Sequence, residues 1–562
     1  MAWPLVMLMV PLWLYGEAVP HRYYPEIPVP REVIAVPQAH VVEEGMVLES
    51  LAGAAARATM EGRASVLVWE DLQYGAYPRW LSELTEAHRI RIRRLNLDEA
   101  VVDLADRGIV KGLVVYRHDR SERSLHDRGP MDESANSGTV IAGLRGGILV
   151  EEALEGHYRA LGLKRLADAR AVTPRACLDR YEPALSRSVM CALDPRVRNV
   201  RSMAIACRAM VVAMSGEDYT RALMRCEPDS PVLGWGAGME DEMTAPSSRA
   251  GLFQTATNWC HNLTVLSTEG LWADGLDLHW EGAARSASPT RARHYVNFTI
   301  TDGDNIQWVM GNFQEGAEGP SYYGNPRRGQ VPFTWGLPAA GLAQLSPRTL
   351  QDVLAAATPN DDFVLYNGGG YFYPDLYGAD RGSTRAIQLH AERLRAYCDL
   401  TDIRVLAFNF QDWDGPEARE ACRIFAQAIP GLLGIFAFQY YPYSAGEGEV
   451  YWVDGADGDQ VPVVSCRKTL WANTPRPNDA PPAQVAGALN GMPAGTGPVF
   501  SWVLVHAWSW FTDAETGADG PGNGAERGYV PALWAAERLE EHVRVVRSDE
   551  LLLRLRAAHA TR

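Results

Sequence analysis

The feature that most constrains the fold is a regular alternation of strand-like and helical segments in the second half of the chain. Eight runs rich in β-branched and aromatic residues follow one another, and stretches of helical periodicity separate most of them. The runs are HYVNFTIT (294–301), VPFTWG (331–336), FVLYNG (363–368), IRVLAFNF (403–410), GIFAFQYY (434–441), VPVVSCR (461–467), VFSWVLVHAW (499–508) and HVRVVR (542–547). This rhythm is typical of a (β/α)8 TIM-like barrel, which we predict for residues 291–562.

The first half predicts a separate mixed α/β domain over residues 19–290. Short apolar strands such as ASVLVW (64–69) and GLVVYR (112–117) alternate with helical stretches such as LDEAVVDLADRG. Strands that alternate with helices indicate a parallel sheet with helices on its faces. No strand-to-helix turn carries the G-x-G-x-x-G spacing of a dinucleotide site, and we predict no cofactor.

The chain begins with an apolar run from Trp3 to Leu14. The run is too short to span a bilayer but has the length of a signal-peptide core, and Gly16-Glu17-Ala18 would serve as a cleavage site. We therefore predict a signal peptide over residues 1–18 and a secreted or extracytoplasmic protein without membrane insertion. The alternative is an N-terminal strand or helix of the folded domain, because no Lys or Arg precedes the run.

Charge and composition narrow the class of partner. The 53 Lys and Arg residues against 69 Asp and Glu give a net charge of −16, which opposes binding to nucleic acid or to an anionic membrane surface. The chain has many large aromatic residues, 17 Trp and 22 Tyr, and their flat rings are suited to stacking on sugar rings. The eight cysteines show no CxxC spacing and predict no zinc site, so disulfides and unpaired buried thiols are the alternatives.

Polar and aromatic residues gather where the predicted strands end. The loops that follow the strands form the active site of a (β/α)8 barrel, so we expect these residues to share one rim. The acidic candidates are Asp302, Asp304, Asp412 and Glu447. The candidates for binding a substrate are Trp335, Gly368, Gly370, Tyr371, Tyr373, Asn409, Trp413, Gln439, Tyr440, His506 and Trp508.

Several of these candidates have an ordinary structural explanation. Asp-Gly-Asp-Asn at 302–305 is common turn chemistry, and Asp412 could cap the helix that begins near Pro416. His506 could be a hydrogen-bonded interior histidine. The turn lacks the ligand spacing of an EF-hand, and we assign no metal ligands.

One stretch within the third predicted loop resembles a known signature. Gly368 to Pro374 reads G-x-G-Y-x-Y-P, which is similar to the string that names the GxGYxYP family of putative glycoside hydrolases. TDGDNIQWVM, about 65 residues upstream, resembles another stretch of that family. The resemblance covers most of the chain and implies an N-terminal domain followed by a barrel-like hydrolase domain that acts on carbohydrate.

Glycoside hydrolysis uses two carboxyl groups, one that protonates the leaving oxygen and one that attacks or activates water. We predict Asp304 and Asp412 as this pair, with Asp302 fixing the first and Glu447 as a substitute acid. The aromatic candidates would stack on a carbohydrate substrate, and Asn409, Gln439 and His506 would read its hydroxyls. The alternatives are a non-catalytic carbohydrate-binding protein with the same cleft, and a metal-dependent hydrolase that uses the DGDN aspartates with His506.

Overall fold

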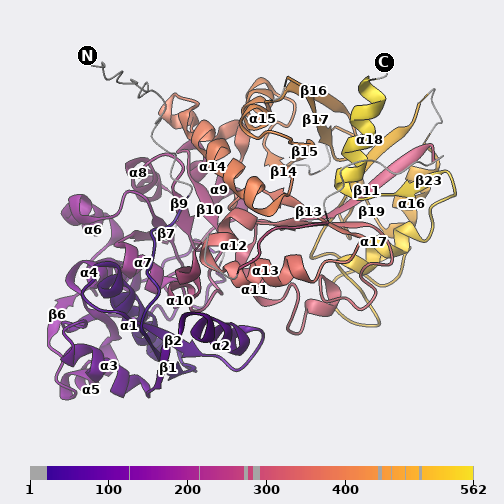
Figure 1. Cartoon of the computed structure of the whole chain (residues 1–562). Coiled ribbons are helices and arrows are strands. Elements are labelled where there is room, and N and C mark those ends of the chain that lie inside the picture. Colours follow the sequence, from indigo (N-terminus) through magenta and orange to yellow (C-terminus); the bar gives the residue numbers. More distant parts are fainter. Residues whose placement is uncertain are drawn as a thin grey trace, which may run out of the picture.

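The computed structural model describes residues 22–560, except 126, 214–215, 271–275, 283–291, 441–442, 444–445, 457, 475 and 493–496. The predicted signal peptide and the predicted boundary at residue 290 lie outside the described residues. In Figure 1 the first half of the chain, from indigo to magenta, lies beside the second half, from orange to yellow.

The first half holds three small parallel sheets. Their strand orders are β2-β1-β3, β5-β4-β6 and β10-β9-β7-β8. The strands are β1 (Glu32–Pro37), β2 (Val66–Asp71), β3 (Arg91–Arg94), β4 (Leu113–Tyr116), β5 (Ile148–Glu151), β6 (Arg165–Asp168), β7 (Met190–Ala192), β8 (Met210–Val212), β9 (Pro231–Leu233) and β10 (Phe253–Thr255). We call the part that surrounds the last sheet, residues 187–268, the third lobe.

Helices cover these sheets, as the alternating pattern predicts. They are α1 (Val42–Met60), α2 (Tyr77–His88), α3 (Leu97–Asp106), α4 (Ser134–Arg145), α5 (Glu155–Ala160), α6 (Pro174–Tyr181), α7 (Arg201–Cys207), α8 (Glu217–Arg225), α9 (Glu240–Arg249) and α10 (Leu263–Leu266). Local sequence fixes some of their ends. The Asn96 side chain accepts a hydrogen bond from the Glu99 N–H while Glu99 bonds back to the Asn96 N–H, a capping box that starts α3.

The second half forms one large, curled sheet whose main strands are parallel. Its order is β16-β17-β15-β14-β13-β12-β11-β20-β18-β19, and β23 also pairs with β11. The strands are β11 (His294–Ile300), β12 (Phe333–Leu337), β13 (Asp361–Tyr366), β14 (Val405–Phe410), β15 (Gly434–Gln439), β16 (Val450–Asp454), β17 (Gln460–Ser465), β18 (Lys468–Leu470), β19 (Asp479–Ala480), β20 (Val499–Val505) and β23 (Val543–Val545). A separate short ribbon joins β21 (Trp510–Phe511) to β22 (Gly517–Ala518).

Helices accompany this sheet as well. They are α11 (Ile306–Gly311), α12 (Ala339–Leu345), α13 (Pro347–Ala355), α14 (Arg385–Thr401), α15 (Pro416–Ala428), α16 (Pro482–Asn490), α17 (Tyr529–Ala536) and α18 (Ser548–Ala560). Each of the eight strand-like runs therefore contains a strand, and the mixed α/β class is confirmed.

The regular eight-stranded order of a TIM barrel is not confirmed. Such a barrel would place the eighth strand between the seventh and the first. Here β11 pairs with β20 along all seven of its residues, and β23 lies on the other edge of β11, opposite His294 to Val296. A strand has only two edges, so β23 and β12 share the second one, and β12 meets β11 only at Thr299.

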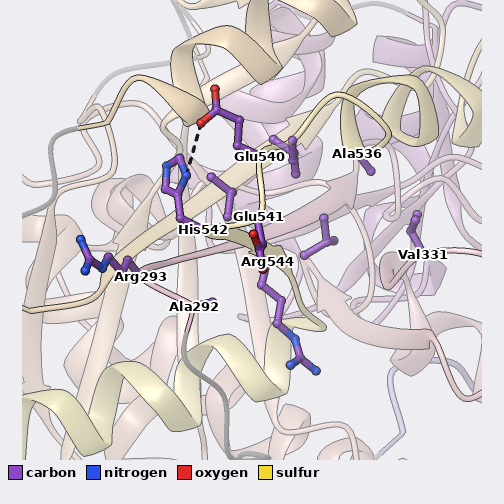
Figure 2. A pocket seen from close by; sticks show the side chains of 11 residues that line it. Ala292, Arg293, Val331, Ala536, Glu540, Glu541, His542 and Arg544 are labelled. Atoms are coloured by element: carbon purple, nitrogen blue, oxygen red, sulfur yellow. Dashed lines mark ion pairs between the residues drawn. The ribbon is translucent and has the colours of Figure 1, made fainter.

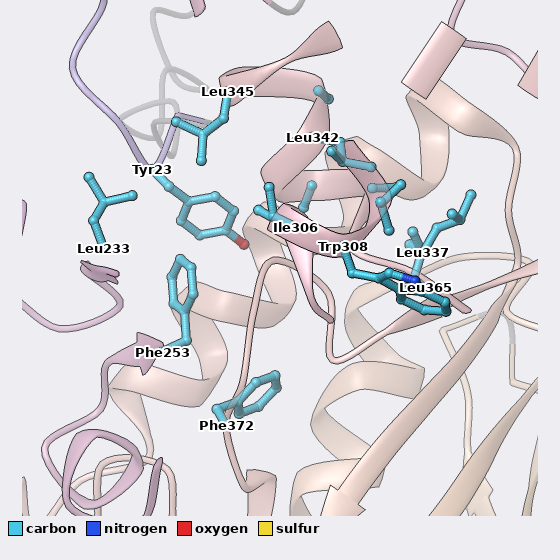
Figure 3. Close-up of a cluster of buried hydrophobic side chains, with 14 of the residues drawn as sticks. Tyr23, Leu233, Phe253, Ile306, Trp308, Leu337, Leu342, Leu345, Leu365 and Phe372 are labelled. Carbon is cyan, nitrogen blue, oxygen red and sulfur yellow. The ribbon is translucent and has the colours of Figure 1, made fainter. Parts of the chain in front are cut away.

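A shared core joins the two halves. Tyr23 and Phe253 from the first half lie close to Phe372 and Ile306 from the second (Figure 3), and all four side chains are buried in one cluster. The rings of Tyr23 and Phe253 are 4.8 Å apart, edge to face. Both rings also lie against Gly369, so this cluster packs the third lobe on the loop that follows β13.

Candidate active site

The turn after β11 places two carboxyl groups at the carboxyl end of the curled sheet. Asp302 has a φ of +60°, and a Cβ on Gly303 would collide with the backbone of Gly336 on β12. Only glycine fits there, so the turn lies directly on the neighbouring strand. Asn305 then caps α11, its side chain accepting the Trp308 N–H at 3.2 Å.

Asp304 is 1 % exposed and is the most perturbed carboxyl group of this turn. Its Oδ2 accepts a hydrogen bond from Asn367 Nδ2 at 2.6 Å, and Tyr371 donates another. Burial and the charge of Asp302 outweigh these donors and raise the pKa of Asp304 to about 8. At neutral pH this carboxyl group therefore carries a proton.

Asp302 is half-buried and better supported as an anion. Burial raises its pKa, but hydrogen bonds from Thr301 and Trp508 act in the opposite direction. Its charge raises the pKa of Asp304, whereas burial alone raises its own. Asp302 is therefore the first of the two to ionise.

A third carboxyl group comes from the first half of the chain. Glu240 is the first residue of α9, the helix that follows β9 in the third lobe. Burial and the charges of Asp304 and Asp302 hold its pKa well above the usual range. No sequence pattern pointed to Glu240, because a single glutamate at the start of a helix is ordinary.

A cavity of about 460 Å³ lies between the third lobe and the curled sheet. Its lining residues are Leu125, Trp235, Gly236, Met239, Glu240, Ala256, Asn258, Trp259, Asn305, Gln307, Tyr371 and Trp508. Trp259 is 55 % exposed and presents its ring at the rim, while Gln307 accepts the Trp259 N–H at 3.0 Å. Acidic and aromatic side chains thus meet in one hollow.

The triple glycine docks the third lobe onto the sheet. Tyr371 and Gln254 exchange two backbone hydrogen bonds, at 2.6 and 2.8 Å, so the stretch pairs with β10. A Cβ on Gly370 would collide with the Gln254 carbonyl, and Gly368 has a φ of +62°. We predicted Gly368 and Gly370 at a substrate. Gly370 instead allows the third lobe to pack closely, and Gly368 lies against Leu394 and His390 of α14.

Tyr371 is the residue that this docking presents to the cavity. Its ring meets that of Trp235 edge to face at 4.9 Å, and its hydroxyl reaches Asp304. Tyr373 is fully buried and packs on half-buried Tyr440, with ring centroids 5.2 Å apart. Only the first of the two motif tyrosines lines the cavity.

The structure does not bring Asp412 or Glu447 to this cavity. Both side chains are exposed. The Asp412 carboxylate lies beside Gly415, the N-cap residue of α15, but makes no capping hydrogen bond there, and neither residue contributes to the shifted pKa of Asp304. The predicted pair of Asp304 and Asp412 therefore requires correction, because the turn after β14 points its acids outward.

Two predicted tryptophans belong to the core. Trp335 is fully buried, donates from Nε1 to Asp361 at 2.8 Å and packs among Phe313 and Tyr529, so it cannot stack on a ligand. Trp413 is 5 % exposed and stacks on Tyr451. The alternation of a short strand does not distinguish inward-facing from outward-facing rings once the sheet curls.

Of the remaining candidates, Trp508 lines the cavity, and the other three bond to protein groups. Asn409 accepts the Tyr366 hydroxyl at 2.9 Å, and Gln439 accepts the Trp413 N–H at 3.1 Å. His506 stacks on Trp471 at 3.5 Å and bonds Ser509, and burial lowers its pKa to about 3. Trp508 lines the cavity and hydrogen-bonds Asp302.

A second hollow, of about 830 Å³, lies at the opposite ends of the strands (Figure 2). Arg293, Glu540, His542 and Arg544 line it, beside the starts of β11 and β23, and Glu540 pairs with His542 at 3.5 Å. Parallel α/β sheets bind ligands at their carboxyl ends, so we place the candidate site at the first cavity.

In the part of the chain that the structure describes, no three His, Cys, Asp or Glu side chains are grouped to hold a metal ion. No helix in that part is long and apolar enough to cross a membrane. The eight cysteines all lie within it, buried and free of disulfides.

Raised carboxyl pKa values beside a cavity at the carboxyl ends of parallel strands are typical of enzymes of the α/β class. Residues 292–516 match the GxGYxYP putative glycoside hydrolase C-terminal domain, and residues 187–268 match the GxGYxYP third domain. The chain belongs to the GxGYxYP family of putative glycoside hydrolases.

A solved structure extends the similarity to the whole fold. The crystal structure of a putative hydrolase from Bacteroides thetaiotaomicron VPI-5482 is 21% identical and has a TM-score of 0.77. The match covers 96% of this chain and 98% of that one, and at this identity it shows the fold. None of the curated proteins matches.

Proposed function

We propose that this protein hydrolyses glycosidic bonds in the cleft between the third lobe and the curled sheet. The observation that carries the proposal is the pair of carboxyl groups, Asp302 and Asp304, on a turn that opens beside a cavity walled by aromatic rings. Glycosidases need an ionised carboxylate at the anomeric carbon, and this pair supplies one because Asp304 holds a proton and leaves Asp302 as the anion.

Asp302 is the carboxylate that acts at the anomeric carbon. It ionises first, is half-buried, and its hydrogen bonds from Thr301 and Trp508 fix its orientation. Asp304 lies beneath it and links the turn to Asn367 and Tyr371. A protonated Asp304 leaves Asp302 as the single anion of the turn, which favours attack on a cationic transition state.

The walls of the cleft favour a carbohydrate. Trp235, Trp259, Tyr371 and Trp508 offer flat faces, while Asn258, Asn305 and Gln307 offer amide groups for hydroxyls. Asn258 also fixes Trp235, bonding its backbone N–H at 2.7 Å and its carbonyl at 2.9 Å. An aromatic platform held this rigidly suits a sugar ring, which presents apolar faces and polar edges.

The experiment compares Asp302→Asn and Asp304→Asn with Asp412→Asn. Hydrolysis is measured on a panel of 4-nitrophenyl glycosides and polysaccharides, with product analysis. We expect kcat/KM to fall by about 10²- to 10⁴-fold in Asp302→Asn, to fall by less in Asp304→Asn because Asp304 only positions the turn, and to stay near the parent value in Asp412→Asn.

Three outcomes would contradict the proposal. Full activity in both Asp302→Asn and Asp304→Asn would remove the pair from the chemistry. Hydrolysis of no panel member, with glycan binding seen by tryptophan fluorescence, would favour a non-catalytic carbohydrate-binding protein. Activity lost to a chelator and restored by a divalent ion would favour a metal-dependent hydrolase.

A further inference from the structure

We propose that Glu240 of the third lobe is the acid that protonates the leaving oxygen, so that the active site is assembled from both halves of the chain. This inference rests on the proposed glycoside hydrolysis and adds a residue to it. Because Glu240 and the DGDN turn lie in different halves, the second half alone would lack one of the two carboxyl groups.

The geometry of the cavity carries the inference. Glu240 lines the same hollow as Tyr371 and Trp508. Tyr371 hydrogen-bonds Asp304, and Trp508 hydrogen-bonds Asp302. A substrate in this hollow would therefore lie between Glu240 on one wall and the two aspartates on the other.

The strands of both sheets deliver these residues to one place. Glu240 follows β9 and Asp302 follows β11, so each lies at the carboxyl end of a parallel strand, where such sheets bind ligands. The Gln307 N–H donates to the Ala256 carbonyl at 3.1 Å, and Gln254 pairs with Tyr371. These contacts hold the two carboxyl ends face to face.

The start of α9 fixes the Glu240 backbone. The Met239 N–H donates to the Glu242 side chain at 2.8 Å, as in a capping box, and the ring of neighbouring Trp235 packs on Tyr371. Glu242 in turn pairs with Arg128 at 3.1 Å. Glu240 itself has no cation within ion-pair distance among the described residues, which is consistent with a carboxyl group that holds a proton.

The surroundings of Glu240 favour its neutral form. Burial and the charges of Asp304, Asp302 and Asp241 raise its pKa, against the weaker opposing effect of the α9 N-terminus. The charge of an ionised Glu240 would also act on five tyrosines, whose pKa values it raises: Tyr366, Tyr371, Tyr373, Tyr440 and Tyr443. All are neutral at neutral pH, and Asp304 holds a proton, so the charges that act on Glu240 are those of Asp302 and Asp241.

The reaction balances with this assignment. The Glu240 proton passes to the glycosidic oxygen as the bond from that oxygen to the anomeric carbon breaks. Water supplies the new oxygen, either directly with Asp302 accepting a proton, or after an ester with Asp302 that water then cleaves. In the direct route, solvent carries the proton from Asp302 back to Glu240; in the ester route, Glu240 takes a proton from the attacking water. In both cases one water is consumed and both carboxyl groups return to their starting states.

The test uses the full chain with Glu240→Gln, and Asp241→Asn as a matched control. Asp241 is the next residue of α9, is exposed, and undergoes the same carboxyl-to-amide change. Substrates are the 4-nitrophenyl glycoside that the parent cleaves best, an unactivated oligosaccharide of the same sugar, and the 2,4-dinitrophenyl glycoside. A good leaving group needs no acid.

We expect Glu240→Gln to lose about 10²- to 10⁴-fold in kcat/KM on the oligosaccharide and far less on the dinitrophenyl substrate. The alkaline limb of its pH profile should disappear. Asp241→Asn should keep its activity and its alkaline limb, moved slightly to lower pH because the Asp241 charge helps to raise the pKa of Glu240. Equal loss on every substrate, or no loss, would overturn the role of Glu240. If Asp302→Asn is also fully active, the proposed function fails as well, which distinguishes the two failures.

An infrared difference spectrum gives a readout without turnover. Parent minus Glu240→Gln at neutral pH should contain the carbonyl band of a protonated carboxyl group, shifted in deuterium oxide. Only an ionised-carboxylate band would overturn the assignment, even if Glu240→Gln lowered activity through misfolding.

Discussion

Two acidic turns of the same curled sheet have similar sequences and opposite surroundings. Asp302-Gly303-Asp304 follows β11, and Asp412-Trp413-Asp414 follows β14. The first is covered by the third lobe, and its carboxyl pKa values rise. In the second, both aspartates are exposed. The comparison teaches that covering by another part of the chain, rather than the acidic pattern, creates the candidate site.

We expect the largest effect from a substitution that separates the third lobe from the DGDN turn. Gly370→Val would push a side chain into the Gln254 carbonyl and separate β10 from the motif. We expect a loss of about 10²-fold or more in kcat/KM, because small misplacements of catalytic groups are costly, together with a lower Tm. Gly487→Ala in α16, where a Cβ meets nothing within 4 Å, is the control. Unchanged activity in Gly370→Val would mean that docking of the third lobe is not needed.

The second prediction concerns pH. Asp304 has a folded pKa of about 8 against about 4 in an unfolded chain, so folding binds a proton between these values and stability falls as pH rises. Asp304→Asn removes this penalty. Its free energy of unfolding relative to the parent should grow from pH 4 to pH 8 by a few kcal/mol, on the order of one per pKa unit, and then level off.

Denaturant melts across this pH range measure the difference. Asp412→Asn, from the exposed turn, should run parallel to the parent throughout. Parallel curves for both variants would show that Asp304 is ordinarily ionised in the folded state.

The third prediction compares the glycines of the two turns. A Cβ at Gly303 meets the backbone of Gly336, which cannot move aside, whereas at Gly415 it meets the flexible Asp412 side chain. Gly303→Ala should cost about 1–3 kcal/mol of unfolding free energy and Gly415→Ala about 0.5 kcal/mol or less. Equal losses of unfolding free energy for Gly303→Ala and Gly415→Ala, measured with urea, would contradict the difference between the two turns.

The smallest expected effect lies at the rim. Trp259→Ala should raise KM by about 2- to 12-fold, the equivalent of one aromatic stacking contact, and leave Tm unchanged because the ring is 55 % exposed. Tyr74→Ala, which removes a ring that is 49 % exposed between β2 and α2, should change neither KM nor Tm. If both variants behave alike in KM, Trp259 does not contact the substrate.

Much of the secondary structure could be predicted from local pattern. Each of the eight apolar runs contains a strand, and Ser548 begins the last helix where the acidic turn Ser548-Asp549-Glu550 predicts a start. The order of the strands could not be read in this way. β23 takes the edge of β11 that it shares with β12, because β20 already occupies the other edge in full.

The site was predictable in part. The DGDN turn and Tyr371 are unusual enough in sequence to be noticed, and Trp508 follows from its strand end. Glu240 carries no such signal, since its chemistry depends on charges more than sixty residues away along the chain. The prediction that Trp335 binds a substrate was wrong for a similar reason. Phe313 and Tyr529 bury its ring, and the sequence of one strand does not show these distant contacts.

By itself, the sequence determined which segments are strands and helices, because apolar periodicity and capping act over a few residues. It also determined that the triple glycine must meet another backbone or a ligand closely. Which of the two it meets was decided only by the tertiary structure, which brings β10 against Gly370 and Glu240 toward Asp302. Contacts between distant segments fix burial, and burial fixes which carboxyl groups keep their protons.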